Sequence, residues 1–143
     1  MLSLTCQTAI KAVIFLASKH ESGAKYGIKE IATFIGASEH SAGKLLQTLV
    51  KAEVIQSSKG PHGGFYLTLK QKKQSIIHIV EAIDGKDVFK QCGLGFSKCS
   101  ASHPCPIHND YKLVRDVFEN LCLNKKVCDL CESLSTGLSY LVG

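Results

Sequence analysis

Three cysteines and a histidine lie close together in the second half of this 143-residue chain. They are Cys92, Cys99, Cys105 and His108, separated by six, five and two residues. Thiolate and imidazole groups are ligands for zinc, copper(I) and iron–sulfur clusters. Glycines in the intervening loop allow the backbone to fold around a metal. The segment therefore predicts a metal site held by these four side chains.

The spacing of the four residues bears on the kind of metal group. Structural zinc sites often use tight Cys-x2-Cys pairs, and the loop has none. Wider spacing favours an iron–sulfur cluster, in which histidine can replace a cysteine ligand. Zinc bound by three cysteines and one histidine is one alternative. Three reduced thiols without any metal are the other.

Four further cysteines complete an odd total of seven, which excludes a fully paired disulfide framework. Cys6 on the first helix and Cys122 near a later apolar seam are expected to pack in the core. Cys128 and Cys131 would share a helix face. They could form a second half-site or a redox pair, but core packing is the preferred interpretation.

The elements that must position this loop begin with helices. Apolar periodicity predicts a helix over residues 5–18 and a short helix over 28–35. Gly36 then breaks the chain, and Ser38 caps a third helix that runs to Ala52. Two short helices joined by a tight turn form a helix-turn-helix. Its second helix presents candidate DNA-binding residues, unless this is only a solvated face: Ser38, His40, Ser41, Lys44, Gln47 and Thr48.

A basic hairpin is expected after the third helix. Residues 54–58 and 65–69 are typical of strands, with Phe65, Leu67 and Leu69 alternating onto one face. The intervening loop contains Lys59 and His62, which would contact the DNA backbone or minor groove. An ordinary hairpin with two cations is the alternative. The order of elements indicates a winged helix-turn-helix that binds double-stranded DNA.

Ser75 is predicted to cap a fourth helix, which ends before Gly85. After the cysteine loop, Pro106 is expected in the first turn of a long helix with a heptad seam. The seam predicts a homodimer interface, with packing against its own domain as the alternative. Its residues are Ile107, Tyr111, Val114, Phe118 and Leu121.

The expected fold is mainly α with a small β-hairpin wing. We divide the chain into a DNA-binding domain (1–85), a cysteine-rich sensor loop (86–105) and a dimerisation helix with a C-terminal tail (106–143). The tail from Lys125 onward is not assigned a structure. The net charge of +5 permits nucleic-acid binding. The absence of a signal peptide or membrane-length apolar stretch predicts a cytoplasmic protein. No nucleophile–base or paired-carboxylate constellation appears, so neither an enzyme nor a small-molecule substrate is expected.

The first 108 residues resemble the IscR/NsrR/CymR group of winged-helix regulators. The motifs that carry the resemblance include Ile28-x-x-Ile31-Ala32, the run from Lys51 to Ile55 and, most specifically, the wing run from Lys59 to Phe65. The cysteine trio is similar to that of the cluster-binding members, and His108 lies where they place a histidine ligand. The resemblance implies a [2Fe–2S] cluster, a homodimer and DNA binding controlled by cluster state.

This chain departs from the group's pattern at several positions. The first intercysteine gap is six residues where five is usual. Lys59 replaces an arginine, and Ser41-Ala42-Gly43 replaces a frequent Tyr-Leu-Glu, so operator sequence cannot be transferred. Nitric-oxide-sensing relatives take an acidic fourth ligand from the first helix of the partner subunit. The nearby residue in this chain is Gln7, a poor ligand, which favours His108 as the fourth ligand. Two rival functions are a cluster-free regulator that uses thiol oxidation or a protein partner, and a zinc or iron–sulfur scaffold without DNA binding.

Overall fold

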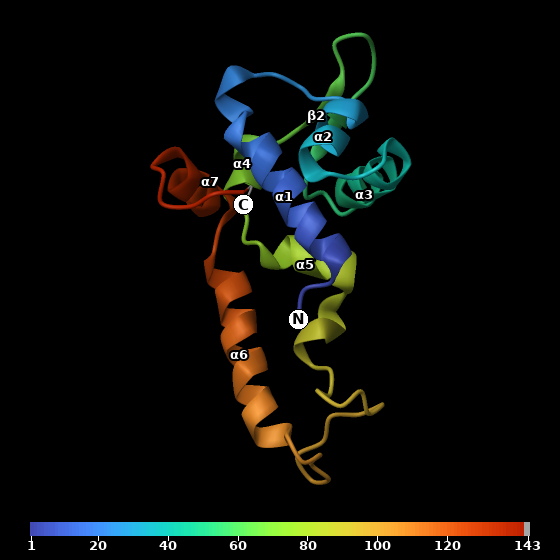
Figure 1. Cartoon of the computed structure of the whole chain (residues 1–143), viewed down its shortest axis with the longest axis vertical. Helices are drawn as coiled ribbons and strands as arrows, with labels where there is room; N and C mark the ends of the chain where they lie inside the picture. Colours follow the sequence, from blue (N-terminus) through green and yellow to red (C-terminus); the bar gives the residue numbers. More distant parts are fainter. Residues whose placement is uncertain (142–143) are drawn as a thin grey trace.

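The computed structural model describes residues 1–141 and contains helices with one two-stranded antiparallel sheet. The expected class, mainly α with a small hairpin, is confirmed. Most elements form a compact body, from which α6 and the cysteine loop extend as a stalk (Figure 1). In chain order the elements are α1 (Leu4–Ser18), η1 (His20–Ser22), α2 (Ile28–Ile35), α3 (Glu39–Lys51), β1 (Gln56–Ser58), β2 (Gly64–Tyr66), α4 (Leu69–Lys72), α5 (Ile77–Asp84), η2 (Lys86–Phe89), α6 (His108–Asn124) and α7 (Val127–Ser135).

Helix α1 is the centre of the body. It contacts α2, α3, α5 and α7, and seven of its residues are buried. A helix that is apolar on most of its sides belongs inside a core. Ser3 begins it with a side-chain cap, because its Oγ accepts a hydrogen bond from the Cys6 amide at 3.0 Å. The other helices are therefore positioned relative to α1.

The helix-turn-helix forms as the sequence predicts. Helix α2 ends at Gly36, whose left-handed φ of 69° requires little energy in glycine. Ser38 then caps α3, with its Oγ accepting from the Ser41 amide at 3.1 Å. Leu46 and Leu49 bury the inner face of α3, which leaves the opposite face in solvent.

The wing is shorter than predicted. Its register pairs Gln56 with Tyr66, and an isolated bridge joins Tyr26 to Phe65. The extension of the second strand to Leu69 is wrong. Leu69 is 58% exposed and begins α4, because Thr68 caps that helix in a capping box with Gln71.

The predicted cap at Ser75 is also wrong. Its hydroxyl donates instead to the Leu123 carbonyl at 2.7 Å, and α5 begins at Ile77 without a side-chain cap. Backbone bonds from Ile76 to Lys125 and from Val127 to Gln74, both 2.9 Å, extend this junction. The segment before α5 thus holds the linker between α6 and α7.

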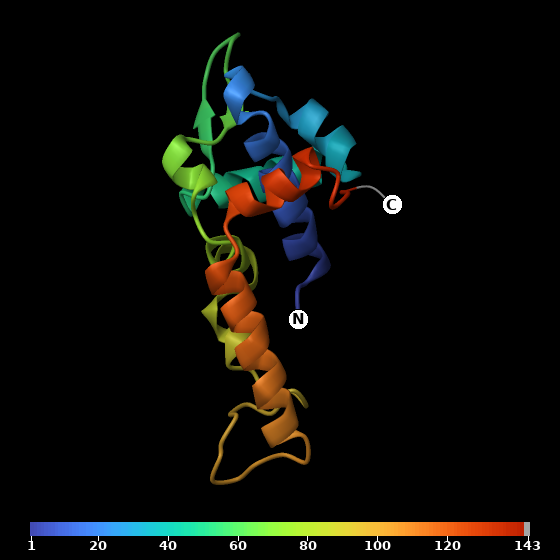
Figure 2. The same ribbon diagram turned by 90° about the vertical axis from the view of Figure 1, so that its left-hand side faces the viewer.

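Helix α7, which the sequence left unassigned, crosses α1 and also contacts α4 (Figure 2). The third sequence segment therefore packs against the first, although the division of the chain into three segments stays a prediction. Helix α6 begins at His108, slightly later than Pro106 suggested. Residues 142–143 of the third segment lie outside the described residues.

Candidate metal centre and nucleic-acid interface

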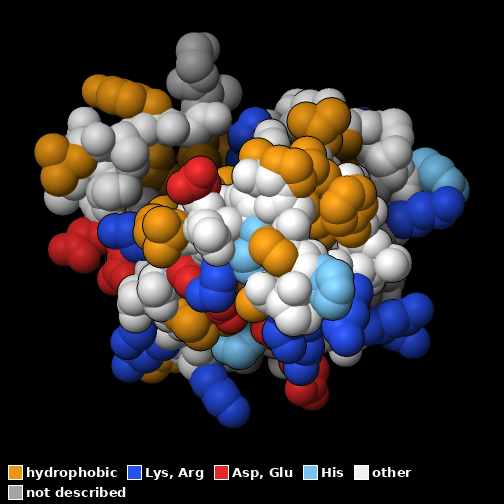
Figure 3. All heavy atoms as spheres, turned by 90° about the horizontal axis from the view of Figure 1, so that it is seen from below, with side chains coloured by type: hydrophobic (Ala, Val, Ile, Leu, Met, Phe, Trp, Pro, Cys, Tyr) orange, Lys and Arg blue, Asp and Glu red, His pale blue; other side chains and the backbone are white. Residues whose placement is uncertain are grey.

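The four predicted ligands lie together at the free end of the stalk. Cys92 follows η2, Cys105 lies in the turn before α6, and His108 is the first residue of α6. These three side chains are at least nine-tenths buried, and Cys99 is half-buried. Hydrophobic side chains gather at this end among Lys, Arg and His (Figure 3). Leu94 and Phe96 of the loop are among the exposed ones.

The ligands are arranged as two pairs. The Sγ atoms of Cys92 and Cys105 are 3.7 Å apart, and Cys99 Sγ lies 3.3 Å from His108 Nδ1. Within residues 1–141, no three His, Cys, Asp or Glu side chains are grouped closely enough to hold one metal ion. The spacing in the sequence predicted proximity, but not this pairing.

The loop backbone favours a thiolate at Cys92. The amides of Leu94 and Phe96, and then that of Gly95, lower the pKa of the Cys92 thiol through hydrogen bonds, against the opposing effect of burial. Backbone N–H groups are fixed dipoles that stabilise an anion without a charged partner. Metal ligation requires the deprotonated thiol, so this environment suits a ligand.

Arg115 connects α6 to the loop and is not among the site residues predicted from the sequence. The side chain is 7% exposed, and its Nη1 donates to the Gln91 carbonyl at 2.5 Å. Its guanidinium lies 5.8 Å from the Tyr111 ring centre. No described carboxylate forms an ion pair with it. The spacing of His108, Tyr111 and Arg115 along one helix face is the signal that could have identified it.

The heptad seam of α6 is only partly covered by its own chain. Phe118 packs against Phe89 of the same chain, with ring centroids 5.4 Å apart, and Tyr111 lies against Gly93. Ile107 also approaches Gly93, whereas Val114 and Leu121 are at least half exposed. Three apolar residues outside the heptad are exposed too, namely Leu113, Val117 and Leu123. We define the outer face of α6 as Leu113, Val114, Val117 and Leu121.

All eight candidate DNA-binding side chains are exposed. On α3, however, Ser38 and Ser41 bond to each other within the helix cap, and Thr48 donates to the Lys44 carbonyl at 3.0 Å. Lys51, which was not predicted, lines the same shallow groove as Lys44. Lysines are therefore the main source of positive charge on this face.

The wing is shaped by two glycines. A Cβ on Gly63 would lie 2.2 Å from the Ser58 carbonyl oxygen, and one on Gly64 would lie 2.9 Å from the Tyr26 carbonyl oxygen. The two-glycine run is therefore needed for the hairpin to close against Tyr26. Lys59 and His62 project from this turn, and the unpredicted Lys25 lies 5.0 Å from the Tyr66 ring centre.

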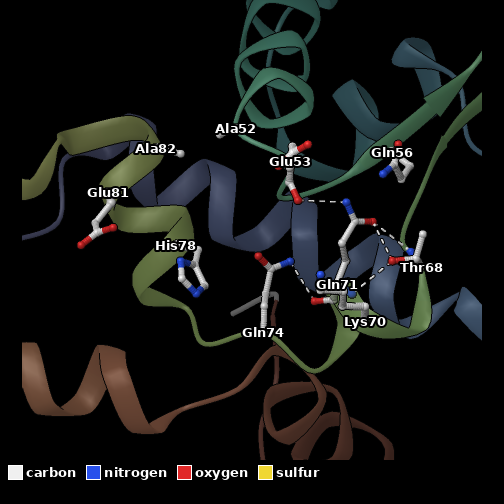
Figure 4. A pocket seen from close by; sticks show the side chains of 10 residues that line it. All are labelled: Ala52, Glu53, Gln56, Thr68, Lys70, Gln71, Gln74, His78, Glu81 and Ala82. Atoms are coloured by element: carbon white, nitrogen blue, oxygen red, sulfur yellow. Dashed lines mark hydrogen bonds between the residues drawn. The ribbon is translucent and has the colours of Figure 1, made fainter.

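A polar cavity of about 760 Å³ lies between the end of α3, the wing base, α4 and α5 (Figure 4). Two of its three glutamine amides form hydrogen bonds within the protein. Gln71 Nε2 donates to the Glu53 carbonyl at 2.9 Å, and Gln74 Nε2 donates to the Val54 carbonyl at 2.8 Å. Glu53 is held at a left-handed φ of 60°. These bonds fix the end of α3 relative to α4 and α5.

The remaining cysteines fall into two groups. Cys6 and Cys122 are buried in the core, as predicted, and burial is the main cause that raises the pKa of their thiols to about 12 and about 11. Cys128 and Cys131 are half-buried and line a second cavity, and Cys131 also packs against the core, as the preferred interpretation expected. Within residues 1–141, no helix has the length and apolar character needed to cross a membrane.

Comparison with known proteins gives consistent matches. The family model for Rrf2, described as an iron-dependent transcriptional regulator, matches residues 2–133. A protein of Aquifex aeolicus named as an HTH-type transcriptional regulator is 28% identical over 128 residues, which cover 88% of each chain. CymR, the global cysteine regulator of B. subtilis, has a TM-score of 0.76 at 20% identity, covering 92% of this chain and 96% of its own. IscR from T. potens has a TM-score of 0.74 at 18% identity, covering 98% and 92%.

The two solved structures support the winged-helix fold, and the family model covers most of the chain. Members of the family and the matched relatives are transcriptional regulators rather than enzymes. The helix-turn-helix, the wing and the matched residues together show that this chain belongs to the Rrf2 family of transcriptional regulators.

Proposed function

We propose that this regulator binds double-stranded DNA as a cytoplasmic homodimer, and that a [2Fe–2S] cluster held by Cys92, Cys99, Cys105 and His108 controls the binding. The observation that carries the proposal is the arrangement of these side chains as two ligand pairs at the end of α6. Membership of the Rrf2 family supports the DNA-binding part of the proposal. The two ligand pairs support the cluster.

The pair distances fit the donor geometry of a two-iron group. Metal–sulfur bonds of about 2.3 Å in a tetrahedral site separate two sulfur ligands by about 3.7 Å. The Cys92–Cys105 distance is 3.7 Å. A single zinc ion would need all four side chains around one point, whereas no such group of three exists within residues 1–141. Each pair is therefore suited to one iron.

The chain's own residues supply the connection to DNA. A bound cluster adds a redox-active charge at the loop, and histidine ligation raises its reduction potential. Cys92 connects through η2 to α5, which contacts α3. His108 connects through α6 and the Ser75 junction to α7, which contacts α1. Control requires that the cluster bind two arrangements of the dimer with different free energies.

DNA binding is assigned to α3 and the wing. We infer that α3 enters the major groove, where Lys44, Gln47 and Thr48 contact base edges or phosphates. Lys59 and His62 would contact the flanking backbone. The outer face of α6 is the proposed dimer contact, because it is apolar and exposed and would bring two copies of α3 to successive half-sites.

One observation favours a second mode of control, thiol oxidation without a cluster. The Cys92 and Cys105 sulfurs are near enough for a modest movement to bring them to the roughly 2.0 Å of a disulfide. In that case a peroxide would oxidise the two thiols. The metal content of the protein separates the two modes.

The test is anaerobic purification followed by absorption spectroscopy and analysis of iron, sulfide and zinc. We expect a coloured protein with equal iron and sulfide, and loss of both in Cys99→Ala. Cys128→Ala, outside the loop, is the matched control and should retain them. Stoichiometric zinc, or a metal-free protein under these conditions, would overturn the cluster assignment.

A further inference from the structure

We propose that the cavity between α1, α2, α4 and α7 is a second ligand site, at which Cys128 and Cys131 bind an apolar, thiophilic molecule such as a trivalent arylarsenical. The cavity has a volume of about 760 Å³. It is independent of the cluster loop, which lies at the other end of α6 (Figure 1). Its lining includes Phe15, Phe34, Lys72, Cys128, Cys131 and Leu134.

The two thiols are placed to act together. They are three residues apart on α7, so they lie on one helix face and both line the cavity. Both are half-buried, whereas the structural thiols Cys6 and Cys122 are at most 1% exposed. Accessible thiols at this spacing can bind one soft atom from two sides.

The cavity wall determines the rest of the ligand. The rings of Phe15 and Phe34 stack with centroids 4.5 Å apart, and Leu134 adds a further apolar surface. Such a wall favours an aromatic or aliphatic group and disfavours a bare hydrated ion. The ligand therefore combines a soft, thiol-binding atom with an apolar body.

The two thiols of the cavity have different surroundings. Lys72 of α4 lowers the pKa of the Cys131 thiol, although burial outweighs this and leaves that pKa raised. Cys128 is the second residue of α7, and its Sγ lies 3.9 Å from the carboxylate of Asp129, which caps this helix by accepting from the Lys126 amide. Cys131 is in weak contact with the Ile14 carbonyl at 3.8 Å and has to leave that contact to bind the ligand.

The binding reaction balances without an oxidant. An arylarsine oxide condenses with two thiols to form two arsenic–sulfur bonds, while the oxide oxygen leaves as water with both thiol protons. The α7–α1 contact would change when Cys131 turns from Ile14 toward arsenic. Because α1 is the centre of the DNA-binding body, occupancy of this site would provide a second input to the regulator.

The probe is phenylarsine oxide, added anaerobically to full-length protein with Cys92, Cys99 and Cys105 replaced by serine. We expect a single adduct by intact-mass spectrometry, with loss of the adduct after a further Cys128→Ser or Cys131→Ser change. Ser135→Ala, on the same helix and cavity wall, is the matched control and should keep it. An adduct that persists without Cys128 or without Cys131 would overturn the proposal.

Two additional measurements test the site in the wild-type protein, so that neither a folding defect of a variant nor the loss of the cluster can explain the result. In cluster-loaded wild-type protein, the probe should protect Cys128 and Cys131 from alkylation in peptide mapping. Phenylarsine oxide should bind about tenfold more tightly than arsenite, because the ring buries apolar area against the phenylalanines. Equal affinities, or absence of protection, would contradict the site even if the cluster assignment holds.

Discussion

At the scale of single residues, the surroundings of each thiol determine its chemistry. Cys6 has no exposed surface, and burial is the first cause that raises the pKa of its thiol to about 12. At Cys92, backbone amides act in the opposite direction and lower the thiol pKa. Position in the sequence is enough to predict that Cys6 packs in the core and that Cys92 is a ligand. It does not predict that backbone amides point at the Cys92 sulfur, because the loop has no periodic pattern from which its backbone conformation could be inferred.

The Cys6 thiol makes stability depend on pH. Its folded pKa is raised from 9.0 to about 12, so its contribution is present below pH 9 and is lost as the pH rises toward 12. We expect the free energy of unfolding to fall less steeply above pH 9 in Cys6→Ala than in the wild type. Urea unfolding at a series of pH values measures this. Identical slopes in the two proteins would contradict the assignment.

Gly93 permits the close contact between the loop and α6. A Cβ at this position would lie 2.7 Å from the Tyr111 ring. Gly93→Ala should therefore displace the loop, with a cost of about 1–3 kcal/mol, and reduce iron retention. Thermal unfolding and iron analysis give the two readouts. Gly27→Ala, where no atom lies within 4 Å of the added Cβ, is the control; equal effects of the two changes would show that the contact is unimportant.

At the scale of elements, the clearest predictions came from local signals. Gly36 and Ser38 identified the turn and cap of the helix-turn-helix, and both act locally. Ser75 resembled a cap equally well, but its partner is Leu123, 48 residues away. No local pattern reports such a partner. Thr68, which is predicted as part of the second strand, instead forms a capping box with Gln71 at the start of α4.

The wing depends on Gly63, where a Cβ would lie 2.2 Å from the Ser58 carbonyl oxygen. Gly63→Ala should open the hairpin and reduce DNA affinity about tenfold, while the helical core stays intact. Fluorescence anisotropy with duplex DNA measures affinity, and circular dichroism reports on the helices. Lys59→Ala should instead weaken binding mainly at low salt, because it removes a single charge. Unchanged affinity in Gly63→Ala would exclude the wing from the interface.

At the scale of the whole molecule, the wing and the cysteine loop lie at opposite ends of the long axis (Figure 1). The sequence predicted which residues form each end, since both are local motifs. It did not predict that α7 returns to α1, and it left open whether the seam faces its own chain, as Tyr111 and Phe118 do. Heptad spacing marks an apolar face but does not identify what covers it.

The proposed dimer uses the outer face of α6. Val117 is 69% exposed at the middle of this face, so Val117→Glu should introduce a charge into the contact and produce monomers. Sedimentation equilibrium measures the change. Leu69→Glu, at an apolar position on α4 that is 58% exposed, should leave the dimer intact. A Val117→Glu protein that remains dimeric would place the interface elsewhere.

The central claim is that the cluster controls DNA binding. It is tested most directly by titrating one duplex, from the protein's own promoter region, with cluster-loaded and cluster-free protein at the same salt concentration. We predict dissociation constants that differ at least about tenfold, a coupling of ~1.4 kcal/mol, with Cys99→Ala matching the cluster-free form after either treatment. Equal dissociation constants for the loaded and cluster-free protein would contradict the account.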